Sequence, residues 1–319
     1  MNNLIISLCK TKTINWTLPL RGLSNQLKTT PRVLITGGHG QLGGTLARTL
    51  RGKHGKDNVI LTDIVKPSQA ISSDGIYRYL DILDSSTLNK TIVDNKIDWV
   101  VHFSALLSAI AESNVQKAID INVTGLINIL QASTKHKCRL FIPSTIGAFG
   151  PDSPLDFTPN TCIQRPNTIY GVTKVFAELL GEYYNHRFGL DFRCLRLPGI
   201  ISADSQPGGG TTDYAVDVFH QIKENGHYEC YLRPDTTLPM MYIDDCIRAM
   251  IEFLEVAPDA VKRRVYNIAA VSFSPEELFS EIKSRYPDAK FAYKPDKRQK
   301  IGNLSLFNLK LDDMPDEQQ

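Results

Sequence analysis

The chain has 319 residues, of which 42% are hydrophobic and 22% are charged. A chain of this length and composition can bury a full core, which excludes a disordered or fibrous protein. Lysine and arginine total 36 against 34 for aspartate and glutamate, so the net charge of +2 gives no electrostatic reason to expect nucleic acid or a membrane surface as the main partner. No apolar run approaches the roughly 18 residues of a membrane helix. We therefore expect a soluble protein with a small-molecule partner.

Six cysteines are scattered singly along the chain, without a C-x-x-C pair or a histidine at metal-ligand spacing. They are Cys9, Cys138, Cys162, Cys194, Cys230 and Cys246. We interpret them as reduced thiols and expect no metal site.

The first thirty residues carry several basic and hydroxyl side chains and no acidic one. This composition is typical of a mitochondrial presequence and predicts a mature protein in the mitochondrial matrix. A disordered N-terminus is the alternative. A secretory signal fits less well, because the apolar run LIISL is short and precedes the basic residues.

From residue 31 onward, apolar runs alternate with amphipathic stretches. Buried strands are predicted at 32–36, 58–62, 76–80, 97–104, 138–144 and 191–197. Helices are predicted between them at 41–50, 85–95, 115–134 and 168–187. Strands separated by helices indicate right-handed βαβ units and therefore an α/β fold with a parallel, doubly wound sheet.

After Pro198 this regularity weakens. A loop rich in Gly, Ser and Pro covers 202–212, and it is followed by predicted helices at 213–224 and 244–256, a strand at 264–270 and a helix capped by Ser274. We divide the chain into a targeting segment at 1–30, a Rossmann-like cofactor core at 31–198 and a smaller, mostly substrate-binding lobe at 199–319. Some elements of the lobe are expected to return to the core.

The strongest local signal is the segment RVLITGGHGQLGG, in which Gly37, Gly40 and Gly43 are spaced three apart between the first strand and helix. A tight turn, a close backbone approach to a pyrophosphate and close helix packing each require glycine. The N-terminus of the helix also directs its N–H groups at the phosphates. The segment therefore predicts a dinucleotide site, although glycine-rich turns also occur without ligands.

Two carboxylates follow the next strands. Asp63 ends the second strand, twenty positions after Gly43, where it can accept hydrogen bonds from the adenosine ribose and repel a 2′-phosphate. This favours NAD over NADP. Asp81, which precedes Ile82, can reach the adenine amino group. For both aspartates, a solvated turn residue is the alternative.

A second group of residues indicates proton transfer. Tyr170 and Lys174, in YGVTK, lie at i and i+4 on one face of a helix. A tyrosine is a poor base at its ordinary pKa of about 10, but an adjacent ammonium group and a bound nicotinamide cation would lower that pKa. Ser144 or Thr145, at the end of the fifth strand, can add a hydroxyl that holds a substrate oxygen.

In their order and spacing, these motifs resemble the extended short-chain dehydrogenase/reductase superfamily from Arg32 to about Asp296. The segments HFSALLSAIAE, STIGAFGP, CIQRPNTIYGVTK and PGGGTTDYAVD resemble more narrowly the animal mitochondrial L-threonine 3-dehydrogenases. The resemblance implies NAD-dependent oxidation of the 3-hydroxyl of L-threonine to 2-amino-3-oxobutanoate. It also implies a homodimer. A nucleotide-sugar epimerase or dehydratase of the same superfamily, or an inactive NAD-binding protein, is the alternative.

The resemblance also assigns roles to residues. The catalytic set is Tyr170 as the acid/base, Lys174, Thr145 and Asn122, the last with a structural and proton-relay role. The expected NAD site comprises Gly37, Gly38, Gly40, Gln41, Leu42, Gly43, Asp63, Asp81, Ile82, Tyr170, Lys174 and Ile200. The expected threonine contacts are Ser108, Thr145, Tyr170, Thr211 and Thr212.

The final segment, 300–319, departs from the family pattern, which usually continues with paired aspartates, a tryptophan-containing element and a last helix. We expect this tail to pack less well and to lower stability and activity, because a terminal helix normally covers an apolar face.

Overall fold

The computed structural model describes residues 30–154, 157–202, 210–268 and 271–302. The predicted targeting segment, apart from its last residue, and residues 303–319 of the tail lie outside this description. A seven-stranded parallel sheet forms the centre of the described chain, in the order β10-β6-β5-β4-β1-β2-β3. Its strands are β1 (Val33–Thr36), β2 (Val59–Asp63), β3 (Tyr77–Tyr79), β4 (Trp99–His102), β5 (Arg139–Thr145), β6 (Phe192–Leu197) and β10 (Val265–Asn267). The predicted doubly wound sheet is confirmed.

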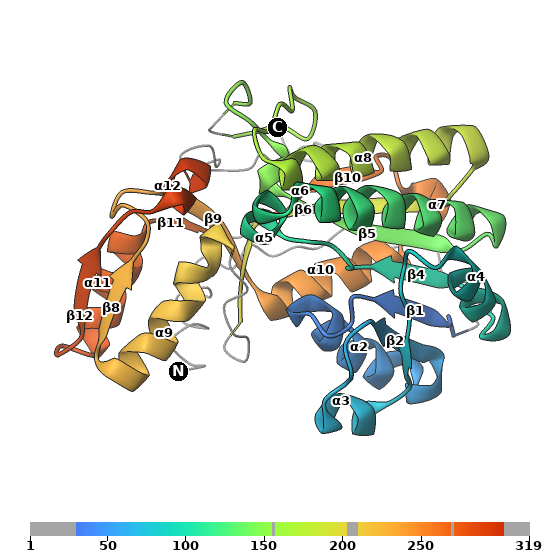
Figure 1. Ribbon diagram of the computed structural model, residues 1–319, viewed down its shortest axis with the longest axis horizontal. Coiled ribbons are helices and arrows are strands. Elements are labelled where there is room, and N and C mark those ends of the chain that lie inside the picture. The colour runs from blue at the N-terminus through green and yellow to red at the C-terminus, as the bar shows by residue number, and fades with distance from the viewer. Residues whose placement is uncertain (1–29, 155–156, 203–209, 269–270, 303–319) are drawn as a thin grey trace, which may run out of the picture.

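Helices cover both faces of this sheet, as Figure 1 shows. On one face, α2 (Gln41–His54) and α10 (Ile243–Glu255) share a core with Val33 and Ile35 of β1. On the other face, α4 (Ser85–Asp94), α7 (Leu126–Lys135) and α8 (Ile169–Phe188) pack against Leu34. Neighbouring residues of β1 thus enter different cores, because side chains alternate along a strand. Burial on both faces explains the continuous apolar runs of the sequence.

The helix predicted at 115–134 is divided. It consists of α6 (Val115–Ile119), a π-helical turn at Asp120–Gly125 and then α7, and it is preceded by the short helix α5 (Ser108–Ser113). Gly125 lies where a Cβ atom would come within 2.5 Å of the Ile82 side chain. The missing side chain at Gly125 therefore lets the helix approach the loop after β3, a feature that a uniform helical period does not reveal.

The smaller lobe has its own sheets and core. β7 (Gly199–Ile201), β9 (Leu238–Tyr242) and β11 (Val271–Phe273) form one sheet, and β8 (His227–Cys230) pairs with β12 (Lys290–Tyr293). The helices α9 (Tyr214–Asn225) and α11 (Pro275–Arg285) bury Tyr214, Val218 and Phe279 against them. Ser274 and Glu277 form the predicted capping box of α11. The last described helix is α12 (Lys297–Gly302), and α3 (Gln69–Asp74) follows β2.

None of the described helices is long and apolar enough to span a membrane. The five described cysteines are free thiols, as predicted, and Cys9 lies outside the described residues. Among the described residues, no three metal-binding side chains of the His, Cys, Asp and Glu types are grouped together.

Candidate functional site

The site lies where the parallel strands end. Because all seven strands point the same way, the residues that follow β1, β2, β3, β4, β5 and β6 meet at one edge of the sheet. In the sheet, β2 and β3 lie on one side of β1, whereas β4 and the strands after it lie on the other side. The strand order therefore reverses at β1, and the glycine-rich turn follows this strand. Open α/β sheets bind ligands at this point.

The glycine-rich turn is shaped by close backbone approaches. Gly37 has a φ of +69°, and a Cβ atom there would lie 2.6 Å from the backbone nitrogen of Ser104. A Cβ atom at Gly43 would lie 2.7 Å from the carbonyl oxygen of Gly37, and one at Gly38 would lie 2.3 Å from the Leu61 side chain. Gly40 is the N-cap of α2, which begins at Gln41 and continues through Leu42. Side chains at these positions would collide with the protein itself, so only glycines allow this tight turn before α2, and such a turn fits a pyrophosphate held by backbone N–H groups at the helix N-terminus.

The Asp63 carboxylate is tied to the same turn. One oxygen accepts a hydrogen bond from the His39 backbone N–H at 2.9 Å, and the other accepts from Ile64 at 2.7 Å. These bonds fix the carboxylate at the end of β2, beside the glycine-rich turn. Asp81 accepts from the Leu83 backbone at 2.9 Å, and Ile82 is buried beneath the π-helical turn. The structure therefore places both aspartates after neighbouring strands, and Asp63 lies next to the start of α2.

Three contacts place Tyr170 at the start of α8. The Thr168 hydroxyl accepts a hydrogen bond from the Gly171 N–H at 3.0 Å, and Glu112 of α5 accepts from the Ile169 N–H at 2.7 Å. Gly171 packs so tightly on the turn after β5 that a Cβ atom would lie 2.2 Å from the carbonyl oxygen of Gly147. Tyr170 is thereby held against the segment that follows β5. Sequence reasoning missed Glu112, because nothing in the pattern ties an exposed glutamate to a helix 57 residues away.

The three predicted reactive groups come together. The Thr145 side chain hydrogen-bonds to Tyr170, and the Lys174 ammonium lies 5.6 Å from the centre of the Tyr170 ring. Lys174 Nζ donates to the carbonyl oxygen of Pro143 at 2.8 Å, and burial lowers the pKa of Lys174 to about 8. Burial also raises the pKa of Tyr170 to about 12. The hydrogen bond with Thr145 lowers that pKa, but by less than burial raises it.

From the sequence we expect a lowered pKa for Tyr170, because both the Lys174 ammonium and a bound nicotinamide cation would favour the phenolate. The raised pKa is opposite in direction to that expectation. In the chain by itself, burial of the tyrosine outweighs the other influences on its pKa.

Ser144 is separated from this group. It is buried, and its hydroxyl donates to Glu178 of α8. Glu178 in turn accepts two hydrogen bonds from the Arg196 guanidinium, at 2.8 and 3.0 Å, and both partners are buried. Of the two hydroxyls left open by the sequence, Thr145 is the one beside Tyr170.

The remaining predicted residues have different surroundings. Asn122 Nδ2 donates to the Leu106 carbonyl at 3.1 Å and to the Thr173 hydroxyl at 3.2 Å, and its Oδ1 accepts from the Leu106 N–H. These bonds hold the loop after β4 against α8, whereas the expected proton relay stays a prediction. Ser108 begins α5, and Ile200 lies in β7. Thr211 and Thr212 form the turn before α9, where the Thr211 hydroxyl is buried without a hydrogen-bond partner in the described chain.

Comparison with known proteins decides the family. The model of the NAD dependent epimerase/dehydratase family matches residues 33–269. The chain belongs to this family. Mitochondrial L-threonine 3-dehydrogenase of Bos taurus is 58% identical over 278 residues, which are 87% of this chain and 74% of that protein. The corresponding protein of Sus scrofa is 57% identical over 87% of this chain and 75% of its own.

Solved structures of L-threonine dehydrogenases are also similar to this chain. L-threonine dehydrogenase from Phytophthora infestans has a TM-score of 0.84 and 42% identity, and the match covers 88% of this chain and 90% of that one. The enzyme from Clostridium difficile has a TM-score of 0.85 and 40% identity, with 89% and 90% covered. UDP-glucose 4-epimerase of Thermotoga maritima, at 22% identity and a TM-score of 0.77, shares the fold alone. The resemblance drawn from the sequence motifs is confirmed.

This member of the epimerase/dehydratase family has a further buried polar residue behind its tyrosine and lysine. His102, at the end of β4, is buried, and its Nδ1 lies 2.8 Å from the Thr36 hydroxyl in a hydrogen bond. His102, Asn122, Thr173 and Lys174 line a cavity of about 10 Å³, which is about the space of one water molecule. Burial, together with the Lys174 charge, lowers the pKa of His102 to about 3. The imidazole is therefore neutral at physiological pH. No sequence pattern indicates this role for His102, because a single histidine in an apolar strand is compatible with any parallel sheet.

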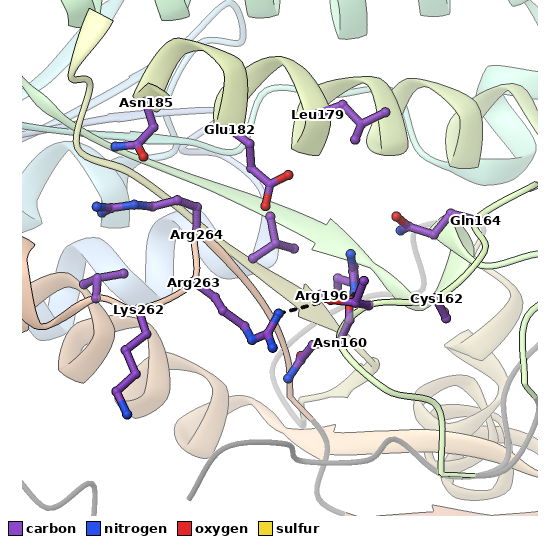
Figure 2. A pocket seen from close by; sticks show the side chains of 13 residues that line it. Asn160, Cys162, Gln164, Leu179, Glu182, Asn185, Arg196, Lys262, Arg263 and Arg264 are labelled. Atoms are coloured by element: carbon purple, nitrogen blue, oxygen red, sulfur yellow. Dashed lines mark hydrogen bonds between the residues drawn. The ribbon is translucent and has the colours of Figure 1, made fainter. Parts of the chain in front are cut away.

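A larger hollow of about 530 Å³ lies apart from the predicted site, between α8, the segment 160–164 and β10 (Figure 2). None of the predicted catalytic or cofactor residues lines it. Its Arg196 is paired with Glu178 and its Arg264 with Asp191, while Lys262 extends away from Arg196 in Figure 2. We therefore assign the chemistry of this family member to the carboxyl edge of the sheet and not to this hollow.

Proposed function

We propose that this chain is an NAD-dependent L-threonine 3-dehydrogenase. It oxidises the 3-hydroxyl of L-threonine to a ketone, which gives 2-amino-3-oxobutanoate, NADH and a proton. The observation that carries the proposal is the contact of Thr145 with Tyr170 beside the buried Lys174, at the edge where the glycine-rich turn lies. The identity to curated L-threonine 3-dehydrogenases supports the choice of substrate.

The cofactor site uses the glycine-rich turn described above. Backbone groups of Gly37, Gly38, Gly40, Gln41, Leu42 and Gly43 hold the pyrophosphate, Asp63 holds the adenosine ribose, Asp81 and Ile82 border the adenine, and Tyr170, Lys174 and Ile200 lie toward the nicotinamide end. The close approaches at Gly37 and Gly43 support this site, because only glycines allow the tight turn at the start of α2 that it requires. When bound, NAD supplies the hydride acceptor.

The chain's own residues handle the proton. Thr145 holds the 3-hydroxyl oxygen of threonine, and Tyr170 Oη removes its proton as general base. A phenol whose pKa lies near 12 is a poor base at neutral pH, so Tyr170 needs positive charge nearby, and Lys174 is placed to supply part of it. The Pro143 carbonyl orients the Lys174 ammonium toward this task. Asn122 supports the site by fixing the loop at Leu106, and a proton-relay role is proposed for it as well.

Recognition of the substrate is assigned to the segments that flank the tyrosine. We assign contacts with the amino and carboxylate groups of threonine to Ser108, Thr211 and Thr212, in addition to Thr145 and Tyr170. The buried Thr211 hydroxyl has no hydrogen-bond partner among the described residues, and such a group is costly unless a ligand satisfies it. In this arrangement the core at 31–198 carries the cofactor and the lobe that follows closes the substrate side.

One assay separates this proposal from the alternatives. NADH formation is measured with L-threonine and, in parallel, with a panel of nucleotide sugars. Threonine-dependent NADH formation is expected. NADH or epimer formation only with a nucleotide sugar would favour an epimerase or dehydratase, and NAD binding without any turnover would favour an inactive NAD-binding protein.

We also propose that the protein works in the mitochondrial matrix. The acid-free composition of residues 1–30 and the mitochondrial relatives support this location. A fluorescent protein fused behind residues 1–30 should colocalise with a matrix marker and lose the segment by cleavage. A diffuse cytosolic signal would contradict the proposal.

A homodimer is proposed from the exposed apolar residues of α5, α6 and α8. Ile110, Val115, Val172, Leu179 and Tyr183 are each more than 40% exposed, and the last three recur at helical spacing along α8. Such a continuous apolar face is typical of an interface between copies. In a sedimentation experiment the chain should behave as a dimer, and Leu179→Glu should weaken the association of the two copies. One similar structure is that of a monomeric L-threonine 3-dehydrogenase, and a monomer here would overturn this part of the proposal.

A further inference from the structure

The helix α12 packs against the turn that carries Thr211. It begins at Lys297, where the resemblance to the superfamily ends, and it contacts the segment Thr211–Asp213. Figure 1 places α12 at one end of the smaller lobe, beside β11 and α11. The end of the described chain is therefore in contact with a segment that belongs to the proposed substrate side.

An arginine of α12 is linked to this turn through a tyrosine. The Arg298 guanidinium carbon lies 3.1 Å from the centre of the Tyr231 ring, and Asp296 fixes the guanidinium by an ion pair of 2.6 Å. The Tyr231 hydroxyl donates to the carbonyl oxygen of Gly210 at 3.2 Å. A cation stacked on a buried aromatic ring, such as that of Tyr231, restrains it. Arg298 thus holds Tyr231 in the orientation in which it reaches Gly210.

Gly210 is held at both of its backbone groups. Its N–H donates to the Asp213 carboxylate at 2.8 Å, while its carbonyl oxygen accepts from Tyr231. Thr211 follows directly, and its hydroxyl is buried and has no partner among the described residues. The position of this hydroxyl therefore depends on how well Gly210 is fixed.

A second side chain of α12 attaches the helix to the loop after β8. Gln299 is buried, its side-chain oxygen accepts from the Arg233 backbone N–H at 2.6 Å, and its amide donates to the Thr236 hydroxyl at 3.0 Å. Because Tyr231 lies two residues before Arg233, these bonds fix the segment from which the tyrosine projects.

We propose that α12 is a positioning element for substrate binding, in which Arg298 and Tyr231 fix Gly210 and thereby the Thr211 hydroxyl. The proposal rests on the proposed function, because it takes Thr211 as a contact for threonine. Arg298 and Tyr231 are positioning residues, since they act through the turn and do not reach the substrate or cofactor themselves.

The test uses the full chain and the variant Tyr231→Phe, which keeps the ring under Arg298 and removes only the hydrogen bond to Gly210. The KM for L-threonine should rise roughly 3- to 10-fold, as the loss of one hydrogen bond implies, while kcat and the Kd for NAD stay near their parent values. Arg298→Ala should act in the same direction. Arg285→Ala is the matched control, because Arg285 lies in the same lobe and its exposed side chain forms an ion pair with Glu281.

A second measurement separates this inference from the proposed function. Hydrogen exchange of the backbone amides at 211–213 should become faster in Tyr231→Phe and Arg298→Ala, while exchange in α2 stays unchanged. Faster exchange in a protein that does not oxidise threonine would refute the function and keep the positioning role. Unchanged exchange together with an unchanged KM for threonine would overturn the inference.

Discussion

Ser144 and Thr145 are neighbours at the end of β5, yet their hydroxyls are bound to different residues of α8. Ser144 donates to the buried Glu178, whereas Thr145 hydrogen-bonds to Tyr170. One hydroxyl therefore belongs to a structural ion-pair network and the other to the reactive group. The two roles lead to opposite expectations for the same type of substitution.

Thr145→Ala should lower kcat by about 10-fold or more and leave the melting temperature near the parent value, because it removes a contact with the reacting oxygen and no buried ion-pair contact. Ser144→Ala should lower the melting temperature instead, because Glu178 loses a buried hydrogen bond, a loss of about 1–3 kcal/mol. Steady-state kinetics and thermal unfolding of both variants check the pair. The assignment fails if Ser144→Ala is the variant that loses turnover in a stable protein.

Tyr170→Phe should lower kcat by roughly 10² or more, because the ring stays in place and only the acid/base hydroxyl is lost. The Kd for NAD should change little. Lys174→Ala is the contrasting variant and should lower kcat and weaken NAD binding, since Lys174 lies beside Tyr170 and is proposed to contact the nicotinamide end of NAD. Turnover of Tyr170→Phe at the parent rate would disprove the role of the tyrosine.

The sheet could be predicted because each buried strand is a continuous apolar run with a helix behind it, as in the segment around Leu34. The glycine-rich turn and the Tyr170 and Lys174 pair were found because both motifs lie within one short stretch of chain. Short strands such as β7, β8 and β12 and the helix α12 were missed, since three to six residues show no reliable period.

Long-range partners were missed for a different reason. The contact of Glu112 with the start of α8 and that of Glu178 with Arg196 join residues far apart in sequence, and only the folded chain brings them together. The direction in which the pKa of Tyr170 is shifted depends on its burial, and burial cannot be determined from the amino-acid composition. The expected loss of stability from the tail at 300–319 stays a prediction, although α12 shows that its first residues continue a packed helix. Melting temperatures of this chain and of one with the usual family terminus would check it.

Gly43→Ala should weaken NAD binding by 10-fold or more. Its Cβ atom would lie 2.7 Å from the Gly37 carbonyl oxygen and 2.9 Å from Gly38 Cα, so the turn that holds the pyrophosphate must shift. The matched control is Gly52→Ala in the same helix, where a Cβ atom meets nothing within 4 Å and should stabilise the helix by about 0.5–1 kcal/mol. Calorimetry with NAD and thermal unfolding give both values. Equal affinity of the two variants would show that the turn is not a phosphate cradle.

NAD should bind well ahead of NADP, because the Asp63 carboxylate accepts hydrogen bonds from a ribose diol and repels a 2′-phosphate. Asp63→Ser removes that charge while keeping a small polar side chain, and the ratio of the two dissociation constants should fall by about 10-fold or more, the effect of about 1.4 kcal/mol. Isothermal titration with both cofactors measures the ratio. Similar dissociation constants for NAD and NADP in the parent chain would remove the argument.

The buried His102 should make the protein acid-sensitive. Its pKa is lowered from 6.5 to about 3 by burial and by the charge of Lys174. Between these values the unfolded chain binds a proton at His102 that the folded chain does not bind, so the free energy of unfolding must decrease as the pH falls from about 6.5 toward 3. One such group contributes a slope of at most about 1.4 kcal/mol per pH unit in this window.

His102→Asn removes the titrating group and keeps an atom that can bond to the Thr36 hydroxyl. Urea unfolding of both proteins between pH 4.5 and 7.5 should show a smaller loss of stability toward acid in the variant, whatever its stability at pH 7.5. His186→Asn, an exposed histidine of α8, is the control and should keep the slope of the parent. Parallel pH profiles for the parent and His102→Asn would mean that His102 binds protons alike in the folded and unfolded chains, and the lowered pKa of the buried imidazole would have to be abandoned.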